Sequence, residues 1–411
     1  MKSTDRIKVA IVSSGYFPVP PVRGGAIESL IEILVKENDI INKLDLTVFS
    51  MYDKSAEGIA RDYINSKIIF IKIPRIVQIL DILIYYICKI ILRKKKHMSY
   101  RYISQRLYYI NEISKRIAQI DYDNLIFENH PTLLSSLKKY NNYEKYKGKY
   151  YYHAHNEITN DFGNKNYLKE VNKFICVSKF IQKSIGEYLN IQSQDRFSVL
   201  KNCVDEEKFK LRDELSVEGF RKKYKIPNDV ILFAFTGRLN SEKGVKELLL
   251  GYKKAKPKNS KLIIAGSYFF GSNMKSHYEI ELKFIAKDIM EEIIFTGNIP
   301  YKEMPFLYAI ADVIVLPSIW NDPAPLTVIE SLTCGKPLIT TFSGGIPEYA
   351  NSDNSILIKV NKDIIENLAQ AIRELSENPE KRMALSEAAK KESMNWTKEN
   401  YYKNFIREFI N

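Results

Sequence analysis

The segment from Ala311 to Tyr349 constrains the fold of this chain more than any other. It predicts a buried strand over 313–316, a loop rich in Pro and Asp, a helix over about 326–334, a second strand over 337–341 and then a Gly-Gly turn. That order is one strand-helix-strand unit of a parallel sheet. In such sheets ligands bind beyond the carboxyl ends of the strands, because helix N-termini expose unpaired N–H groups there.

Four residues of this segment predict the chemistry of a ligand. Asp322 lies in the first loop, Glu330 follows eight positions later in the helix, and Gly344 and Gly345 end the second strand. Carboxylates accept hydrogen bonds from hydroxyl pairs, and exposed backbone N–H groups bind anions. The segment therefore predicts a site for a nucleotide sugar.

The same segment resembles the donor-site signature of glycosyltransferase family 4, which are retaining enzymes with the GT-B fold. The signature has two acidic residues separated by seven others, which here are Asp322 and Glu330, followed by SLTCGKP and SGGIPE. In the family the first acid is usually Glu, so Asp322 departs from the signature by having a shorter side chain. The resemblance implies that Glu330 holds the ribose and that Asp322 and backbone N–H groups near Gly345 hold the donor sugar. We also expect Leu326 and Thr327, at the start of the helix, in the donor site.

The loop after the predicted strand 231–235 supplies positive charge. In TGRLNSEKG, Gly237 gives the backbone the conformational freedom that a turn needs, and Arg238 and Lys243 flank this turn. A forked guanidinium and a mobile ammonium can together neutralise a departing diphosphate without a metal. The family resemblance assigns the same role to both residues. Two surface cations beside a turn are the weaker alternative, and a Walker-type phosphate loop is excluded because the chain has no G-x4-GK[ST].

The length and the alternation of elements predict two domains. The 411 residues exceed one ordinary core, and 45% hydrophobic with 27% charged residues is typical of a globular protein. Strands and helices alternate in both halves, which favours an α/β fold of doubly wound parallel sheets. The resemblance implies GT-B architecture, two Rossmann-like domains facing a cleft. We expect an acceptor domain over 1–204, a nucleotide-sugar domain over 205–395, and a last helix over 396–411 that packs back on the first domain.

The first predicted strand, Ile7 to Ser13, leads into the loop SGYFPVPPVRGG. Gly24 and Gly25 let backbone approach a ligand at the N-terminus of the following helix. In the family a Gly-Gly loop here contacts the donor phosphates or the acceptor. A Gly pair also serves any tight entry into a helix, so this alternative stays open.

Two histidines in YYHAHNE, His153 and His155, follow a predicted strand over 148–152. A neutral imidazole there can donate to a sugar hydroxyl. By resemblance, His155 approaches the donor sugar from the first domain. No further ligands stand at a spacing that indicates zinc. The Asp121-Tyr122-Asp123 sequence resembles a metal-binding Asp-x-Asp, but it precedes a strand, so we interpret it as a turn.

The formal net charge of +13 is typical of proteins that bind an anionic partner, such as nucleic acid, an anionic membrane or an anionic substrate. Nucleic acid is disfavoured because no zinc-finger spacing or RNP-type aromatic signature is present. The apolar stretch Ile76 to Leu92 is followed by RKKKH, and a basic amphipathic helix of this kind can lie on an anionic membrane. A domain helix with a solvated basic loop is an equal alternative.

The cellular compartment is predicted from what the sequence lacks. No opening stretch resembles a secretory signal, and the cysteines have no paired spacing; they are Cys88, Cys176, Cys203 and Cys334. We expect a cytoplasmic protein with reduced thiols, with the inner face of the cell membrane as its alternative location.

The function that follows is transfer of a sugar from a UDP- or GDP-sugar to an acceptor hydroxyl with retention, without a metal or other cofactor. A lipid-linked glycan in surface-polysaccharide assembly is the expected acceptor, and a protein acceptor is the alternative. Three rivals remain: a non-catalytic partner of an active glycosyltransferase, a nucleotide-sugar epimerase of similar fold, and a nucleic-acid-binding protein.

Overall fold

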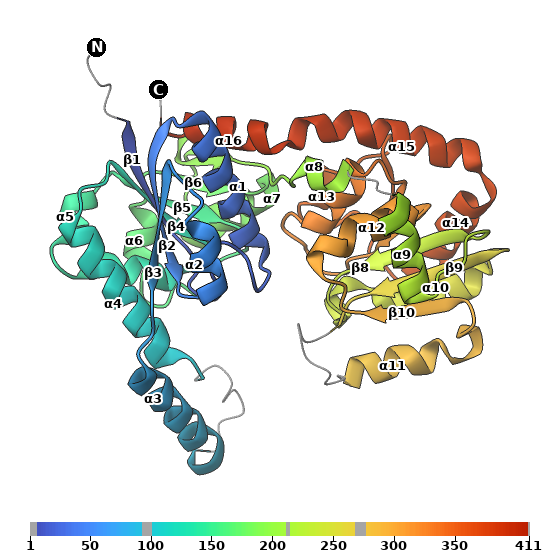
Figure 1. Cartoon of the computed structure of the whole chain (residues 1–411), viewed down its shortest axis with the longest axis horizontal. Helices are drawn as coiled ribbons and strands as arrows, with labels where there is room; N and C mark the ends of the chain where they lie inside the picture. Colours follow the sequence, from blue (N-terminus) through green and yellow to red (C-terminus); the bar gives the residue numbers. More distant parts are fainter. Residues whose placement is uncertain (1–5, 93–100, 211–213, 268–276, 410–411) are drawn as a thin grey trace. The chain divides into compact units, whose positions relative to one another are not determined.

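A computed structural model of the chain describes residues 6–92, 101–210, 214–267 and 277–409. The chain forms two compact units (Figure 1). The first comprises Met1–Leu200 and Tyr401–Asn411, and the second comprises Lys201–Asn400. Each unit contains one parallel sheet with helices against it, and each is described by itself below.

The first unit is built on a seven-stranded sheet in the order β3-β2-β1-β4-β5-β6-β7, and every neighbouring pair is parallel. Its strands are β1 (Ile7–Val12), β2 (Leu44–Met51), β3 (Ser66–Ile71), β4 (Asn124–Glu128), β5 (Tyr150–Ala154), β6 (Phe174–Cys176) and β7 (Phe197–Val199). The run from Val9 to Val12 is fully buried because helices cover both faces of the sheet. Strand β5 ends two residues later than predicted, so His153 lies inside the strand.

The helices of the first unit alternate with these strands. They are α1 (Ala26–Ile41), α2 (Lys54–Ala60), α3 (Arg75–Tyr86), α4 (Ile103–Gln119), α5 (Asn142–Tyr146), α6 (Lys165–Lys169) and α7 (Lys179–Leu189). A short π-helical turn, Ile87–Ile91, continues α3. The buried Asp81 of α3 accepts hydrogen bonds from the backbone N–H groups of Ser104 (2.7 Å) and Gln105 (3.0 Å), and thereby caps α4.

The second unit contains a six-stranded parallel sheet in the order β10-β9-β8-β11-β12-β13. Its strands are β8 (Ile231–Thr236), β9 (Ser260–Ala265), β10 (Ile293–Gly297), β11 (Val313–Leu316), β12 (Leu338–Thr341) and β13 (Ser355–Ile358). Its helices are α8 (Glu206–Lys210), α9 (Glu214–Tyr224), α10 (Val245–Ala255), α11 (His277–Ile285), α12 (Met304–Ile310), α13 (Leu326–Thr333), α14 (Ile364–Glu377) and α15 (Pro379–Ser393).

Strand order fixes where each sheet can bind a ligand. The chain direction across the sheet reverses between β1 and β4 in the first unit and between β8 and β11 in the second. Loops that leave the two strands at such a switch point diverge to opposite faces, and a ligand crevice opens between them. The doubly wound α/β fold predicted from the sequence is therefore confirmed in both units.

The C-terminal segment packs through its aromatic side chains. Trp396 lies against Tyr349 in the second unit, with ring centroids 5.4 Å apart. In the first unit, Tyr402 of α16 (Lys398–Arg407) donates from its hydroxyl to Asn38 at 2.5 Å, and Phe409 contacts Tyr151. Within the ranges that the structure describes, no helix has the length and apolarity needed to span a bilayer.

Candidate functional site

The loop after β8 carries the predicted cations and lies against the loop after β11. Gly244 has φ +68°, and a Cβ there would lie 1.9 Å from the carbonyl oxygen of Pro317. Only glycine permits both this conformation and this close approach. The short helical turn Ser241–Lys243 is therefore held directly beside the end of β11.

We expect Gly244→Ala to destabilise the second unit by about 2 kcal/mol and to weaken ligand binding there, because the loop must move away from Pro317. Gly219→Ala in α9 is the matched control, since a Cβ at Gly219 meets open space and alanine favours a helix. Denaturant unfolding measures both variants. Equal stabilities would show that the close approach does not matter.

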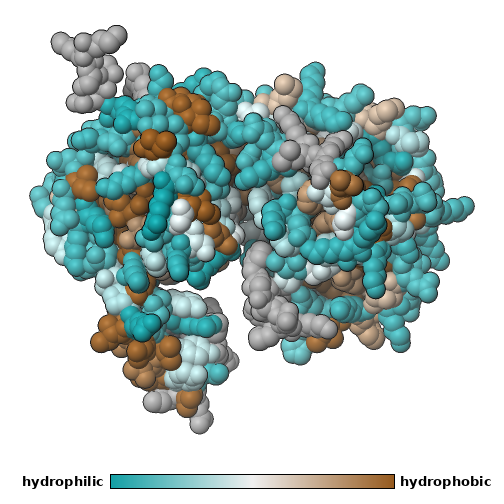
Figure 2. Space-filling view, viewed as in Figure 1, coloured by the Kyte–Doolittle hydropathy of each residue, from teal (hydrophilic) through white to brown (hydrophobic). Residues whose placement is uncertain are grey.

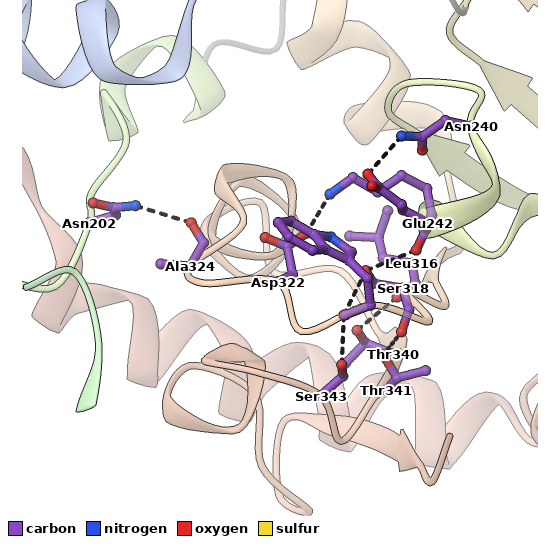
Figure 3. Close-up of polar contacts among 12 residues, drawn as sticks. Asn202, Asn240, Glu242, Leu316, Ser318, Asp322, Ala324, Thr340, Thr341 and Ser343 are labelled. Carbon is purple, nitrogen blue, oxygen red and sulfur yellow. Dashed lines mark hydrogen bonds and ion pairs between the residues drawn. The ribbon is translucent and has the colours of Figure 1, made fainter. Parts of the chain in front are cut away.

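Three strand-end loops are joined by hydrogen bonds (Figure 3). The N–H of Ile319 donates to the carbonyl of Glu242 at 2.9 Å, which connects the loop after β11 to the loop after β8. The hydroxyl of Ser318 donates to the same carbonyl at 3.3 Å. The hydroxyls of Thr341, the last residue of β12, and of Ser343 in the following loop donate to the carbonyls of Ser318 and Trp320, both at 2.6 Å. These contacts fix the backbone of the loop from which Asp322 extends.

Lys243, in the loop after β8, forms an ion pair with Asp322, in the loop after β11. The side chain of Asp322 is 7% exposed and that of Lys243 is 20% exposed, so the pair is shielded but open to solvent on the lysine side. The ammonium also lies 6.0 Å from the ring centroid of Trp320. An incoming anion can therefore reach Lys243 without first exposing a buried cation.

Gly344 and Gly345 bring the turn after β12 against the same loop. The N–H of Gly345 donates to the carbonyl of Asp322 at 2.8 Å. Gly344 has φ +55°, and a Cβ there would lie 2.4 Å from that carbonyl oxygen. Lys243, Asp322, Gly344 and Gly345 thus come together, although the N–H of Gly345 is already used within the protein.

Glu330 lies on α13, which begins with the half-buried Leu326 and Thr327. Its two carboxylate oxygens accept hydrogen bonds from the hydroxyls of Tyr301 (3.1 Å) and Tyr308 (2.7 Å). Burial raises the pKa of Glu330, against the effect of these two hydrogen bonds. A carboxylate offers about four lone-pair sites, so two acceptor positions are left for a ligand hydroxyl.

Arg238 stands apart from these contacts. Its side chain is exposed, and it makes no ion pair with any residue in the described ranges. Within those ranges no hydrogen bond or ion pair joins Glu330 to Arg238 or to Lys243 either. The structure thus brings Lys243, Asp322 and the glycine turn into contact, and leaves Arg238 and Glu330 as separate groups of the same unit.

The glycine loop of the first unit leads into α1. Gly25 is the N-cap residue with φ +119°, and Glu28 of the first turn lies over it, while Gly24 is exposed. The hydroxyl of Ser14 donates to the carboxylate of Glu28 at 2.7 Å. Burial raises the pKa of Glu28 from 4.5 to about 7, so this carboxyl is largely protonated in mildly acidic solution.

Glu28 predicts a pH dependence of stability. Because its folded-state pKa is raised, its contribution is fully present below pH 4.5 and is lost as the pH rises through about 7. Relative to Glu28→Gln, the wild-type chain should lose about 2 kcal/mol of unfolding free energy between pH 5 and pH 8. Denaturant titrations of both proteins at the two pH values measure this difference. Parallel pH profiles would contradict the prediction.

His153 and His155 meet at a residue that the sequence analysis did not select. Glu128, the last residue of β4, lies 3.1 Å from Nδ1 of His153 and 2.9 Å from Nε2 of His155. The three groups could hold a metal ion, since their ligand atoms all lie within 4.8 Å of one another. The sequence predicted no third metal-ligating residue beside the two histidines, and Glu128 shows that this prediction was wrong. Asp123, by contrast, directly precedes β4, and its carboxylate accepts a hydrogen bond from the N–H of Lys8 in β1.

Few features of the sequence point to the site residues Glu128, Tyr301 and Tyr308. Glu128 ends an apolar strand, and a charged residue at that position is unusual in a sheet covered on both faces. Tyr301 and Tyr308, which hold Glu330, are two of 27 tyrosines and carry no motif. Only the hydrogen bonds from their hydroxyls to Glu330 identify them.

The comparisons with known proteins agree with this architecture. Residues 216–392 match the family "Glycosyl transferases group 1". The chain is 26% identical over 364 residues to YtcC of Bacillus subtilis, whose name assigns it provisionally to the glycosyltransferases, and the match covers 86% of this chain and 79% of YtcC. A lipopolysaccharide 1,2-N-acetylglucosaminetransferase of Salmonella typhimurium is 26% identical over 43% of this chain and 46% of its own length.

Solved structures show the same fold over the whole chain. A glycosyltransferase from Rickettsia africae superposes with a TM-score of 0.75 at 19% identity, over 98% of this chain and 97% of that protein. Anabaena HepE, solved in complex with UDP, gives a TM-score of 0.70 at 16% identity, over 98% of this chain and 99% of HepE. With its second unit matched by the family, the chain is a glycosyltransferase with the GT-B fold.

Proposed function

We propose that this enzyme transfers a sugar from a nucleoside-diphosphate sugar to an acceptor hydroxyl with retention at the anomeric carbon, as a member of glycosyltransferase family 4. The observation that carries the proposal is the Lys243–Asp322 pair, held among the loops that follow β8, β11 and β12. A solvent-accessible ammonium at a topological switch point is suited to a diphosphate.

In this reaction the bond between the anomeric carbon and the phosphate oxygen breaks, and a bond from the acceptor oxygen to the same carbon forms. The departing diphosphate takes the acceptor proton, so no separate base is required. Lys243, with Arg238 moving in from solvent, stabilises the negative charge that develops on the diphosphate. Glu330 holds the ribose, and Asp322, freed from Lys243 by the incoming phosphate, accepts from a hydroxyl of the donor sugar.

The donor is a UDP- or GDP-sugar. HepE binds UDP and UDP-glucose, and a Corynebacterium glutamicum relative is named for its dependence on GDP-mannose, so both bases are represented among similar proteins. Thermal-shift measurements with a panel of nucleotide sugars should show stabilisation by one base, and transfer should continue in EDTA. Complete loss of transfer on chelation would contradict the metal-independent mechanism.

A lipid-linked glycan is the acceptor that the surface of the first unit favours. The outer face of α3 and its π-helical turn exposes large apolar side chains at helical spacing, which project from the rest of the unit (Figures 1 and 2). They are Ile76, Ile79, Leu80, Leu83, Tyr86, Ile87 and Ile90, each 45–75% exposed. Apolar patches this large mark a partner.

An anionic bilayer is the partner that we propose for this face. Arg75 and Lys89 lie on the same segment, and the chain continues directly with RKKKH, which lies outside the described residues. An apolar helical face with adjacent basic residues lies in the interface of anionic lipid. This face supports a location at the cytoplasmic face of the membrane, where we expect the enzyme to meet a lipid-linked acceptor of surface-polysaccharide assembly.

Vesicle sedimentation tests the membrane face. The double variant Ile79→Glu, Leu83→Glu should bind vesicles containing phosphatidylglycerol at least about tenfold more weakly than wild type, because two apolar side chains no longer enter the interface. Ile64→Glu is the control, since Ile64 is 89% exposed outside this face. If the double variant instead converts a dimer to a monomer and binds vesicles normally, the face is an interface between copies of the chain.

The rival functions give different results in the same assays. An epimerase would convert the donor without an acceptor, and a non-catalytic partner subunit would fail to turn over any donor alone. A protein O-glycosyltransferase would modify a polypeptide in place of a lipid-linked glycan, and a nucleic-acid-binding protein would show salt-dependent affinity for generic DNA.

A further inference from the structure

Three polar side chains are buried at the carboxyl ends of β4 and β5. Glu128 is 0% exposed, His153 is 1% exposed and His155 is 8% exposed. Glu128 stands opposite His153 in the parallel register of the two strands, and His155 follows two positions later on the same side. Burying a carboxylate is costly unless it is paired, so the cluster requires an explanation.

Both imidazoles use the same carboxylate. His153 Nδ1 lies 3.1 Å from Oε2 of Glu128, and His155 Nε2 lies 2.9 Å from the same oxygen. Burial raises the pKa of Glu128, but the charge and hydrogen bonds of the two histidines outweigh it and lower the pKa to about 2. Burial, and then the neighbouring His153, lower the pKa of His155 to about 4. At neutral pH the cluster therefore contains an ionised carboxylate and a neutral His155.

The position of the Glu128 carboxylate, 2.9 Å from Nε2, determines the tautomer of His155. An ionised carboxylate can only accept hydrogen bonds, so His155 must donate its single N–H from Nε2. Its other nitrogen, Nδ1, then has a lone pair and no proton. In this tautomer Nδ1 can accept a hydrogen bond from a ligand hydroxyl, whereas the sequence predicted a ring that donates one.

A metal ion fits the same three residues less well. A set of two histidines and one carboxylate suits zinc, and metal-bound histidines donate their other ring N–H to an acceptor. If His153 bound a metal through Nδ1, its Nε2 would carry the proton. That atom is buried and has no hydrogen-bond partner in the described part of the chain, so the N–H would be unsatisfied.

We propose that Glu128 is a positioning residue that holds His155 as the Nε2–H tautomer, so that Nδ1 accepts a hydrogen bond from a hydroxyl of the sugar substrate. His153 supports the carboxylate from the other side by donating its Nδ1–H. The identity of the hydroxyl ligand rests on the proposed function, whereas the tautomer follows from the cluster itself. No proton is transferred in this arrangement.

Long-range ¹H–¹⁵N correlation of the full-length wild-type protein at pH 7 tests the tautomer directly. The chain has only five histidines, so single His→Gln variants assign the signals. We expect a protonated Nε2 and an unprotonated Nδ1 for His155, with the opposite arrangement for His153. A protonated Nδ1 on His155, or an imidazolium, would overturn the proposal.

Variants at Glu128 test its consequence. Glu128→Leu removes the acceptor and should give mixed tautomers of His155 and a fall in kcat/KM of about tenfold to a hundredfold. Glu128→Gln is the second variant, used if Glu128→Leu fails to fold. Because it keeps one acceptor oxygen, it should shift the His155 tautomer and lower kcat/KM less than Glu128→Leu. Asp121→Asn is the control, because Asp121 precedes the same strand and its side chain is 92% exposed. Unchanged tautomers or unchanged kinetics in a folded Glu128 variant would contradict the proposal.

Zinc titration of the wild type separates the metal alternative. We expect no stoichiometric binding and no change in the signals of His153 and His155. Tight 1:1 binding that shifts both signals would replace the positioning role with a metal site. If the tautomers are as expected but no nucleotide sugar is used by the enzyme, the cluster stands and the proposed function fails.

Discussion

Lys243→Ala should lower kcat/KM for sugar transfer by about a hundredfold to a thousandfold. The ammonium stabilises charge that develops on the departing diphosphate, and removing one such group from a preorganised site typically costs this much. Lys243→Arg keeps the charge but not the geometry, so it should recover part of the activity. Steady-state kinetics with the donor identified by thermal shift measure all three enzymes.

The effect of Lys243→Ala on stability must be separated from its effect on transfer. Without the ammonium, the 7% exposed carboxylate of Asp322 has lost its cation, and we expect a destabilisation of about 2 kcal/mol. The kinetics are therefore compared at a temperature where both proteins are folded. Lys246→Ala is the matched control, because Lys246 makes an ion pair with Glu281 in which both side chains are 44% exposed. A loss of transfer equal in both variants would show that the effect is not specific to the site.

Glu330→Gln should raise the KM for the nucleotide sugar by about tenfold to a hundredfold and leave kcat nearly unchanged. A hydrogen bond between a charged carboxylate and the ribose contributes about 1.5–3 kcal/mol, and the ribose is bound equally in the ground state and the transition state. Glutamine keeps the side-chain volume and one acceptor for Tyr308. Initial-rate kinetics at varied donor concentration separate the two constants.

Glu303→Gln is the control for Glu330, because Glu303, the N-cap residue of α12, makes its ion pair with Lys223. The donor KM of this control should equal that of the wild type. A fall in kcat with unchanged KM in Glu330→Gln would place Glu330 at the reacting atoms and not at the ribose.

The sequence predicts the contact between Lys243 and Asp322 only through topology. Apolar runs such as Val313–Leu316 mark the strands, and the loops after two adjacent strands of a doubly wound sheet meet at their carboxyl ends. Which strands are adjacent depends on crossovers that local pattern does not encode. The pairing of β8 with β11, across about eighty residues of sequence, brings the two loops together.

Other parts of the site could not be predicted because they depend on side-chain packing. The hydroxyls that hold Glu330 come from residues without a motif, and the position of Glu128 beside His153 requires the register of β4 against β5. The apolar face of α3 was ambiguous in sequence, because a helix buried in a domain has a similar composition. In the folded chain the large apolar side chains of this face are exposed, which supports the proposed membrane face.

The central claim is that the second unit binds a nucleoside diphosphate, with Lys243 at the diphosphate and Glu330 at the ribose. Calorimetric titration of the full-length chain with UDP and with GDP, in the presence of EDTA, tests it most directly. We predict saturable 1:1 binding of one nucleotide, weakened at least about tenfold by Lys243→Ala and by Glu330→Gln and unaffected by Lys246→Ala. Equal affinity in the wild type and in both site variants would contradict the claim.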